Sequence, residues 1–379
     1  MPYTQSAAAY RVKSGFVAIL GRPNVGKSTL LNALTGEKVA IVTAKPQTTR
    51  NRIAGVVEVP AHKGLHQAAQ IVFVDTPGVH KTASELDRRM LQEVHEALES
   101  RDLVLVLVDV TRRIKLGAVD EMNSKSAGAP GPSHPGTGEA HSSASRASQK
   151  TLNTRASSED EFLFSLIRKL DCPVFLVLTK IDLVRKDQLL PLIESLMRQY
   201  NFAEVIPVSA RKRDGLDVLI HKIVDVLPVG ERYYPKDQYT DQPMRFMVAE
   251  LIRESILIET GEEIPYASAV VIEQFEEPEL PPRPGKRPLV RIAAAIYCER
   301  EGQKAILIGK GGAKLKEIGT GARKQIESLL GTRVYLELRV IVEPGWRESR
   351  SFVESLDWRR QLEELATEQG PDKATFEDE

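Results

Sequence analysis

The eight residues Gly21-Arg-Pro-Asn-Val-Gly-Lys-Ser28 constrain the fold of this chain more than any other stretch. They fit the pattern GxxxxGK[ST], follow the apolar run Phe16–Leu20 and precede an apolar helical stretch, which is the context that a phosphate-binding loop requires. The glycines let the backbone curl so that its N–H groups and the helix N-terminus face phosphate oxygens. A chance glycine-rich turn is the alternative, and the flanking strand and helix disfavour it.

The stretch from Gly15 to Leu227 repeats one pattern, in which an apolar run leads through a turn into a helix-period segment. This alternation is typical of a parallel α/β sheet. The clearest predicted strands are Phe16–Leu20, Ile71–Val74, Leu103–Val108, Val174–Leu178 and Val205–Val208. The sequence thus predicts a P-loop NTPase fold, with a mostly parallel sheet and helices on both faces.

Two further motifs predict a magnesium-dependent phosphate site. Lys27 is expected to reach the β- and γ-phosphates, and Ser28 to bind Mg²⁺. Asp75-Thr-Pro-Gly78 follows a strand and matches DxxG, in which the carboxylate holds Mg²⁺ through water and the glycine N–H contacts the γ-phosphate. Between the motifs, Thr49 is the predicted third magnesium ligand in a switch I loop, with Thr48 as the alternative.

The next two motifs predict guanine as the base. Thr179-Lys180-Ile-Asp182 matches [NT]KxD, and Ser209-Ala210-Arg211 resembles the SAK loop whose N–H meets guanine O6. The Asp182 carboxylate can accept hydrogen bonds from guanine N1 and N2, whereas adenine would leave a buried carboxylate unpaired. Four motifs in this order, each at the carboxyl end of a strand, predict a GTP site rather than an ATP site.

The second half of the chain predicts a smaller α+β domain. It is expected as helix 245–258, strand 268–275, strand 290–298, two helices flanking Gly309-Lys310-Gly311-Gly312, and strand 334–342. This order is that of a type II KH module, whose GxxG loop lets a nucleic-acid backbone approach closely. An isolated GxxG is more often a helix C-cap followed by a turn, so the surrounding order of elements carries the prediction.

The chain has equal numbers of acidic and basic residues, so affinity for RNA requires a local basic surface. Such a surface is predicted around the GKGG loop. The candidate RNA contacts are Lys304, Gly309, Lys310, Gly311, Gly312 and Lys314.

The chain resembles the Era family of GTPases in GRPNVGKSTLLNALTGEKVAIVTAKPQTTR, VDTPGVH, TKID and SAR, and in the segment around GKGG. It departs from the family at Thr179, where asparagine is usual, and at Arg211, where lysine is common. The resemblance implies a G domain followed by a KH domain, with GTP or GDP and Mg²⁺ as ligands. The nucleotide contacts expected are Gly21, Asn24, Gly26, Lys27, Ser28, Thr29, Asp75, Gly78, Thr179, Lys180, Asp182, Ser209, Ala210 and Arg211.

Hydrolysis is expected to be slow, because Val79 stands where many GTPases carry a water-orienting glutamine. Lys27, Thr49, Asp75, Gly78 and Asn24 are the candidate catalytic residues. In relatives of the resembled family a P-loop asparagine helps to hold potassium, so K⁺ dependence through Asn24 is a hypothesis.

The expected domain limits are a tail at 1–14, the G domain at 15–228, a linker at 229–243, the KH domain at 244–345 and a C-terminal helix with an acidic tail at 346–379. Within the G domain, residues 118 to about 158 are rich in Ser, Gly, Ala and Pro and are expected to form a disordered insertion.

The resemblance implies a GTPase that binds the 3′ region of 16S rRNA and assists maturation of the 30S ribosomal subunit. A cytoplasmic monomer is expected, with contact at the inner membrane as an open hypothesis. Two alternatives remain, a GTPase whose KH domain docks a protein and a scaffold that binds RNA and holds nucleotide without hydrolysis.

Overall fold

The computed structural model describes residues 12–45, 47–62, 66–78, 84–112, 159–261, 263–277 and 288–359. The chain forms two compact units. The first comprises residues up to Ala40, Arg52–Lys81 and Glu93–Asp241, and the second comprises Ile41–Asn51, Thr82–Gln92 and the chain from Gln242. The second unit therefore contains two segments that the sequence assigns to the G domain.

The first unit is built on a seven-stranded sheet with the order β2-β3-β1-β4-β5-β6, in which β7 also pairs with β1. Its strands are β1 (Val12–Gly21), β2 (Ile53–Val59), β3 (Ala69–Asp75), β4 (Leu103–Asp109), β5 (Val174–Thr179), β6 (Glu204–Pro207) and β7 (Val229–Gly230). Strands β3, β1, β4, β5 and β6 are parallel to one another, whereas β2 is antiparallel to β3 and β7 is antiparallel to β1. This confirms the predicted, mostly parallel sheet.

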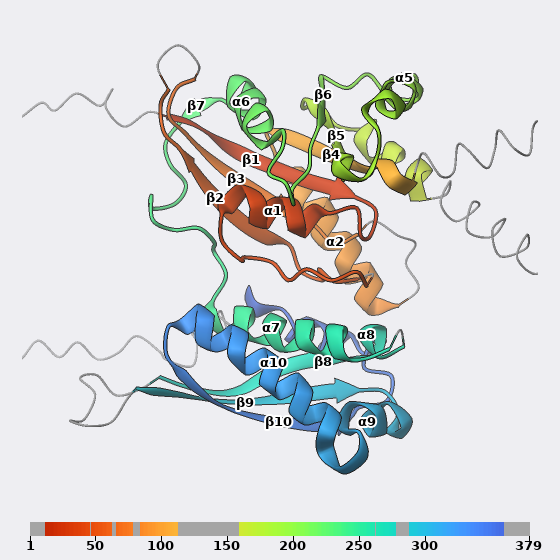
Figure 1. The fold of residues 1–379 in the computed structure, drawn as a ribbon, viewed down its shortest axis with the longest axis vertical. Helices are drawn as coiled ribbons and strands as arrows, with labels where there is room; N and C mark the ends of the chain where they lie inside the picture. The colour runs from red at the N-terminus through yellow and green to blue at the C-terminus, as the bar shows by residue number, and fades with distance from the viewer. Residues whose placement is uncertain are drawn as a thin grey trace, which may run out of the picture. The chain divides into compact units, whose positions relative to one another are not determined.

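Helices cover both faces of this sheet (Figure 1). On one face pack α1 (Lys27–Thr35) and α6 (Leu216–Val226), through leucines such as Leu30 and Leu219. The other face is covered by the second half of α2 (Glu85–Glu99), a helical segment at 159–167 and α5 (Leu189–Met197). Strand β4 needs both layers, because Leu103 to Val108 are all buried.

The parallel arrangement positions the nucleotide motifs. The phosphate-binding loop follows β1, Asp75 ends β3, Asp109 ends β4 and Thr179 ends β5. Because the carboxyl ends of parallel strands lie at one edge of a sheet, these residues gather there.

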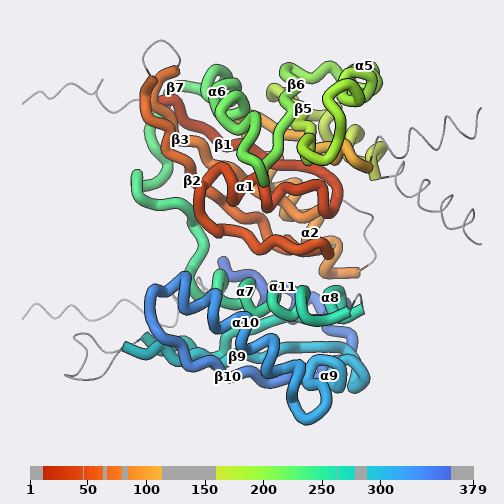
Figure 2. The backbone as a smooth tube through the Cα atoms, viewed as in Figure 1, coloured from red at the N-terminus to blue at the C-terminus, as the bar shows by residue number. Residues whose placement is uncertain are grey.

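The second unit has a three-stranded sheet with the order β10-β9-β8, in which β9 and β10 are parallel and β8 is antiparallel to β9. Its elements are α7 (Met244–Glu259), α8 (Ile264–Ala267), β8 (Ala269–Glu276), β9 (Leu289–Cys298), α9 (Glu301–Ile308), α10 (Ala313–Leu330), β10 (Arg333–Val342) and α11 (Arg350–Ser355). Apolar side chains of α7, α9 and α10 form one core with β9. Figure 2 follows this path through the unit.

The predicted type II KH order is therefore confirmed, with the one-turn helix α8 as an addition. The fold class as a whole is confirmed as a P-loop G domain followed by an α+β KH domain. Among the described residues, no helix combines the length and the hydropathy that a membrane span requires.

Candidate functional site

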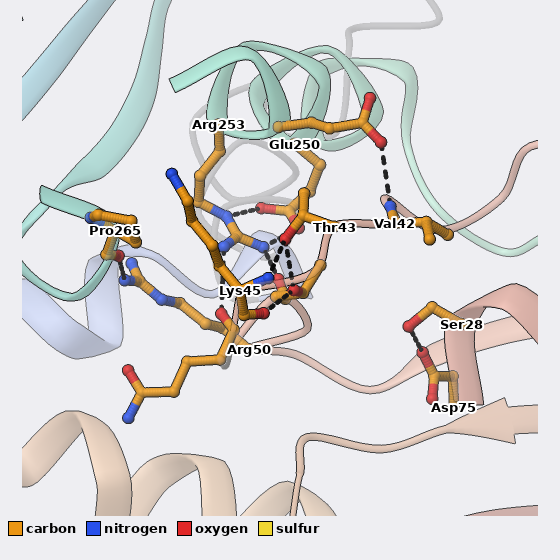
Figure 3. A network of polar contacts seen from close by, with 12 residues as sticks. Ser28, Val42, Thr43, Lys45, Arg50, Asp75, Glu250, Arg253 and Pro265 are labelled. Atoms are coloured by element: carbon orange, nitrogen blue, oxygen red, sulfur yellow. Dashed lines mark hydrogen bonds and ion pairs between the residues drawn. The ribbon is translucent and has the colours of Figure 1, made fainter. Parts of the chain in front are cut away.

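The phosphate-binding loop brings three predicted residues together. Gly26 caps α1, and the buried Lys27 Nζ donates to the carbonyls of Gly21 and Arg22 at 3.1 Å each. The Ser28 hydroxyl donates to Asp75 Oδ2 at 2.6 Å (Figure 3). Mg²⁺ prefers oxygen ligands such as hydroxyl and carboxylate groups, so Ser28 and Asp75 are suitable ligands for the predicted magnesium ion.

Gly78 lies directly against the phosphate-binding loop. A Cβ at this position would come within 2.9 Å of the Pro23 backbone nitrogen. Only glycine fits this approach without displacing the loop, which explains the last residue of the DxxG motif. Thr76 adds a second tie, because its hydroxyl donates to the Ile19 carbonyl of β1 at 2.8 Å.

Burial lowers the pKa of Lys27 from 10.5 to about 8, and the nearby Asp75 carboxylate partly opposes that shift. The ammonium group thus lies where a charged lysine is costly without a full counter-charge. A nucleotide phosphate would supply that charge.

Asp182 and Ser209, the residues predicted to bind guanine, lie in direct contact. Ser209 is buried and its hydroxyl donates to Asp182 Oδ1 at 2.7 Å, while Asp182 itself is exposed. Sequence reasoning took this carboxylate as buried. The structure shows instead that Asp182 is exposed. Adenine would therefore cost binding free energy only if the bound base covered this carboxylate.

Thr179 and Lys180 tie this side to the phosphate-binding loop. Thr179 is buried, and its hydroxyl donates to the Val25 carbonyl at 2.7 Å and lies 3.2 Å from the Val108 carbonyl. Lys180 Nζ donates to the Asn24 carbonyl at 2.9 Å and to Asp109 Oδ2 at 2.6 Å. The threonine therefore reaches the loop despite its short side chain.

Asp109 is a residue beside the predicted site that sequence reasoning did not name as a candidate. It ends β4, pairs with Lys180, and accepts hydrogen bonds from the N–H and hydroxyl of Thr111. The available signal was an acidic residue ending a buried strand beside the strand that carries the TKID motif.

The other nucleotide candidates belong to the same motifs. Asn24 is exposed with a left-handed backbone (φ 61°), Thr29 and Ala210 are half-buried, and Arg211 is exposed. Val79 and the 118–158 insertion lie outside the described residues.

Thr49 belongs to a segment, Ile41–Asn51, that clusters in the second unit. Arg253 of α7 donates to the carbonyls of Gln47 and Thr48, and Glu254 accepts from the Val42 N–H at 3.0 Å. Figure 3 labels Arg253 and Val42 in this network. Lys45 Nζ donates to the Thr260 carbonyl just after this helix. Residues of switch I on the N-terminal side of Thr49, the predicted magnesium ligand, are therefore held by the first helix of the KH domain and the residue after it.

Arg50 anchors the end of the same segment. Its guanidinium donates to the carbonyls of Ser268 and Pro265 at 2.8 and 2.9 Å and lies 5.7 Å from the ring centroid of Trp346. Arg50 is buried. Sequence reasoning named no partner for it, because these contacts span more than 200 residues.

The GKGG loop connects α9 to α10 as predicted. Gly311 has φ 61°, and a Cβ at this position would meet no atom within 4 Å. A Cβ on Gly309 would instead lie 2.7 Å from Lys314 Cβ. Gly311 therefore leaves open space for a backbone to approach, whereas Gly309 packs against the start of α10, and Gly312 caps that helix.

The lysines around this loop differ in their partners. Lys314 Nζ pairs with Glu317 and Glu259 at 2.5 and 3.5 Å. Lys304 and the exposed Lys310 have no carboxylate partner in the described part of the chain. Lys310 and Lys304 are thus the better placed cations for a phosphate, and Lys314 would first have to exchange its partners.

A groove of about 490 Å³ runs between α10 and β10 beside the loop. It is lined by apolar and basic residues, which are Gly312, Leu315, Lys316, Gly319, Thr320, Arg323, Leu336 and Leu338. Of the apolar residues near the loop, Leu315 lines the groove, Ile318 is fully buried core and Ile306 is exposed. The mixture of apolar floor and basic edge suits unstacked bases and their phosphates.

Comparison with protein families identifies both domains. A model described as 50S ribosome-binding GTPase matches residues 16–131, and a KH domain model matches residues 263–347.

Comparison with curated proteins and solved structures covers nearly the whole chain. GTPase Era of Lacticaseibacillus paracasei is 42% identical, over 91% of this chain and 96% of its own. GTPase Era of Ruminiclostridium cellulolyticum is 37% identical, over 92% of this chain and 98% of its own. A structure of Era with MgGDPNP and nucleotides 1506–1542 of 16S rRNA matches with a TM-score of 0.73 at 35% identity, covering 90% of this chain and 97% of that one.

Proposed function

The chain belongs to the Era family of GTPases, and from this premise we propose that it is a GTP-hydrolysing switch that binds the 3′ region of 16S rRNA. Through this RNA it assists maturation of the 30S subunit. The observation that supports GTP binding is the pair of hydrogen bonds from Thr179 and Lys180 to the phosphate-binding loop. It joins base recognition and phosphate recognition in one site.

In the proposed site, Mg²⁺ would be held by Ser28 and Asp75, with Thr49 as the third ligand, and would neutralise phosphate charge. Lys27 binds the β- and γ-phosphates and offsets charge that develops during hydrolysis. Gly78 offers its N–H to the γ-phosphate. Asn24 is the proposed potassium contact, and faster phosphate release in K⁺ than in Na⁺ at equal ionic strength is the expected result.

The docked switch I supports a link between nucleotide and RNA. Arg253 and Glu254 of the KH helix α7 hold Val42, Gln47 and Thr48. If Thr49 helps to hold Mg²⁺ when GTP is bound, these contacts would have to change, and the KH domain would then respond to the presence of GTP.

The proposed RNA site is the GKGG loop with the adjoining groove. Lys304 and Lys310 would meet the RNA backbone, and Leu315, Leu336 and Leu338 would contact bases. The proposal includes a cytoplasmic monomer that works on the 30S subunit. Contact with the inner membrane is a separate hypothesis, which co-sedimentation with anionic lipid vesicles tests.

The nucleotide half is tested by exchanging Asp182. Asp182→Asn is expected to lower GTP affinity about 100-fold, because two hydrogen bonds to a charged acceptor are lost at about 3 kcal/mol. The same variant should gain affinity for xanthosine triphosphate, since an amide can donate to the base O2 and accept from N1–H.

Asp187→Asn is the matched control, because Asp187 is exposed and, among the residues that the structure describes, pairs with Arg185 alone, near the same loop. Phosphate release is measured with both nucleotides. Unchanged GTP affinity in Asp182→Asn would refute the assigned base site. Tight GDP binding without phosphate release in K⁺ would instead support the scaffold alternative.

A further inference from the structure

A small pocket in the second unit is lined by four arginines, Arg50, Arg89, Arg245 and Arg253. Its volume is about 50 Å³, too small for a nucleoside. Every residue that lines it belongs to this unit. It shares no lining residue with the GKGG groove.

The carboxylates around the pocket offset only part of this positive charge. Arg253 pairs with Glu250, and Arg89 pairs with Asp357 at 2.7 Å. Arg245 instead donates to the Ile272 carbonyl at 3.1 Å, and Arg50 donates only to carbonyls. Two guanidinium groups thus lack a carboxylate partner in the described part of the chain.

Arg50 is the most telling of the four. It is 6% exposed, and its Nε makes no hydrogen bond within the described residues although it is fully enclosed. Burial and then the neighbouring Arg253 lower its pKa to about 9, and Glu250 and Asp87 only partly oppose that shift. A buried cation with an unused donor beside a second arginine is costly unless an anion supplies further negative charge.

From this geometry we propose that the pocket of Arg50, Arg89, Arg245 and Arg253 binds a phosphate group. Guanidinium forks match phosphate oxygens in two-point contacts, and two unpaired positive charges match the dianion of inorganic phosphate better than a phosphodiester. The apolar wall of Phe246, Val353 and Leu356 limits water and strengthens the attraction. Because Arg50 ends switch I, the bound anion would stabilise the docked segment.

The test uses the full chain saturated with Mg²⁺ and a nonhydrolysable GTP analogue, so that phosphate cannot enter the P-loop. Inorganic phosphate is titrated at constant ionic strength, and binding is followed by calorimetry and by the melting temperature. Arg245→Gln should weaken phosphate binding about tenfold, which corresponds to one charge-assisted hydrogen bond. Arg291→Gln is the control, because Arg291 lies over the Tyr335 ring on the KH sheet and does not line the pocket.

Arg50→Lys provides a second variant, which keeps the charge and removes the fork. Phosphate binding that is weakened by Arg245→Gln and Arg50→Lys, but not by Arg291→Gln, supports the site. RNA affinity then assigns the source: a loss in Arg245→Gln indicates a backbone phosphate, and no loss indicates free phosphate. Equal phosphate binding in wild type and in both pocket variants overturns the proposal, whatever the outcome for GTP hydrolysis.

Discussion

At the scale of single residues, Thr179 shows how a departure from the Era pattern is accommodated. Asparagine is usual at this position in the family, and threonine has the shorter side chain. In the structure, the loop carbonyl of Val25 lies 2.7 Å from the threonine hydroxyl. The contact depends on how closely two loops approach, which a sequence motif does not specify.

Removing that hydroxyl should weaken nucleotide binding. Thr179→Val keeps the shape but leaves the buried Val25 carbonyl without this donor, so GDP affinity should fall about fivefold, for about 1 kcal/mol. Titration with a fluorescent GDP analogue measures it. Thr320→Val, in α10, is the control for the general effect of exchanging threonine for valine. Equal GDP affinity in Thr179→Val and wild type would show that the contact contributes nothing to the free energy of nucleotide binding.

Lys27 predicts a pH dependence of nucleotide affinity. Its pKa is lowered to about 8 by burial, and a bound phosphate raises it again, so binding takes up a proton above that pH. GDP affinity should therefore be level below pH 7 and fall as pH rises from 8 to 9, by at most about tenfold per unit.

The same lowered pKa affects folding. Between pH 8 and 10.5 the unfolded chain holds more protons at Lys27 than the folded chain, so the contribution of Lys27 to the free energy of unfolding rises with pH in this range.

The matched variant for this effect is Lys27→Arg, which stays charged throughout the range. Ionisation of the guanine base affects binding to the variant and to the wild type equally. The difference between the two pH profiles therefore reports the protonation of Lys27 alone. Parallel profiles would contradict the assignment.

At the scale of elements, periodicity predicted the helices and strands of the KH domain to within one or two residues. Strand β1 was predicted as Phe16–Leu20 but begins at Val12, because Val12 and Lys13 pair with β7, more than 200 residues away. The short elements β7 and α8 lack the length to produce a pattern. The contacts of switch I with α7 could not be predicted from a sequence pattern either, because their partners lie more than 200 residues apart.

The contact between switch I and α7 gives an element-scale prediction. Arg253→Met removes the donors to the Gln47 and Thr48 carbonyls, so the two nucleotide states should differ less in RNA affinity. We expect the ratio of RNA affinities with a GTP analogue and with GDP to fall at least about fivefold, a coupling loss of about 1 kcal/mol. Arg333→Met, at an exposed position of β10, is the control, and an unchanged ratio in Arg253→Met would exclude this contact as the link.

At the scale of the whole molecule, the four motifs and the GKGG loop were enough to predict both domains and their order. They did not predict that residues 41–51 and 82–92 belong with the KH domain in the folded chain. A motif indicates what a local stretch of backbone must do, such as contact a phosphate. Which unit a segment packs into depends instead on contacts between residues far apart in the sequence, such as Arg50 and Trp346.

The central claim is that the guanine nucleotide sets the affinity of the KH domain for 16S rRNA. Gly311→Asp is the most suitable variant, because a side chain at this position meets no other atom and an aspartate tolerates positive φ. Its carboxylate would repel the RNA backbone without disturbing the core.

The measurement is fluorescence anisotropy of a labelled oligonucleotide from the 3′ end of 16S rRNA, at fixed salt, with a nonhydrolysable GTP analogue and with GDP. The account predicts tighter binding with the GTP analogue and loss of that binding in Gly311→Asp. Equal affinity in the two nucleotide states, or no binding in either, would contradict it.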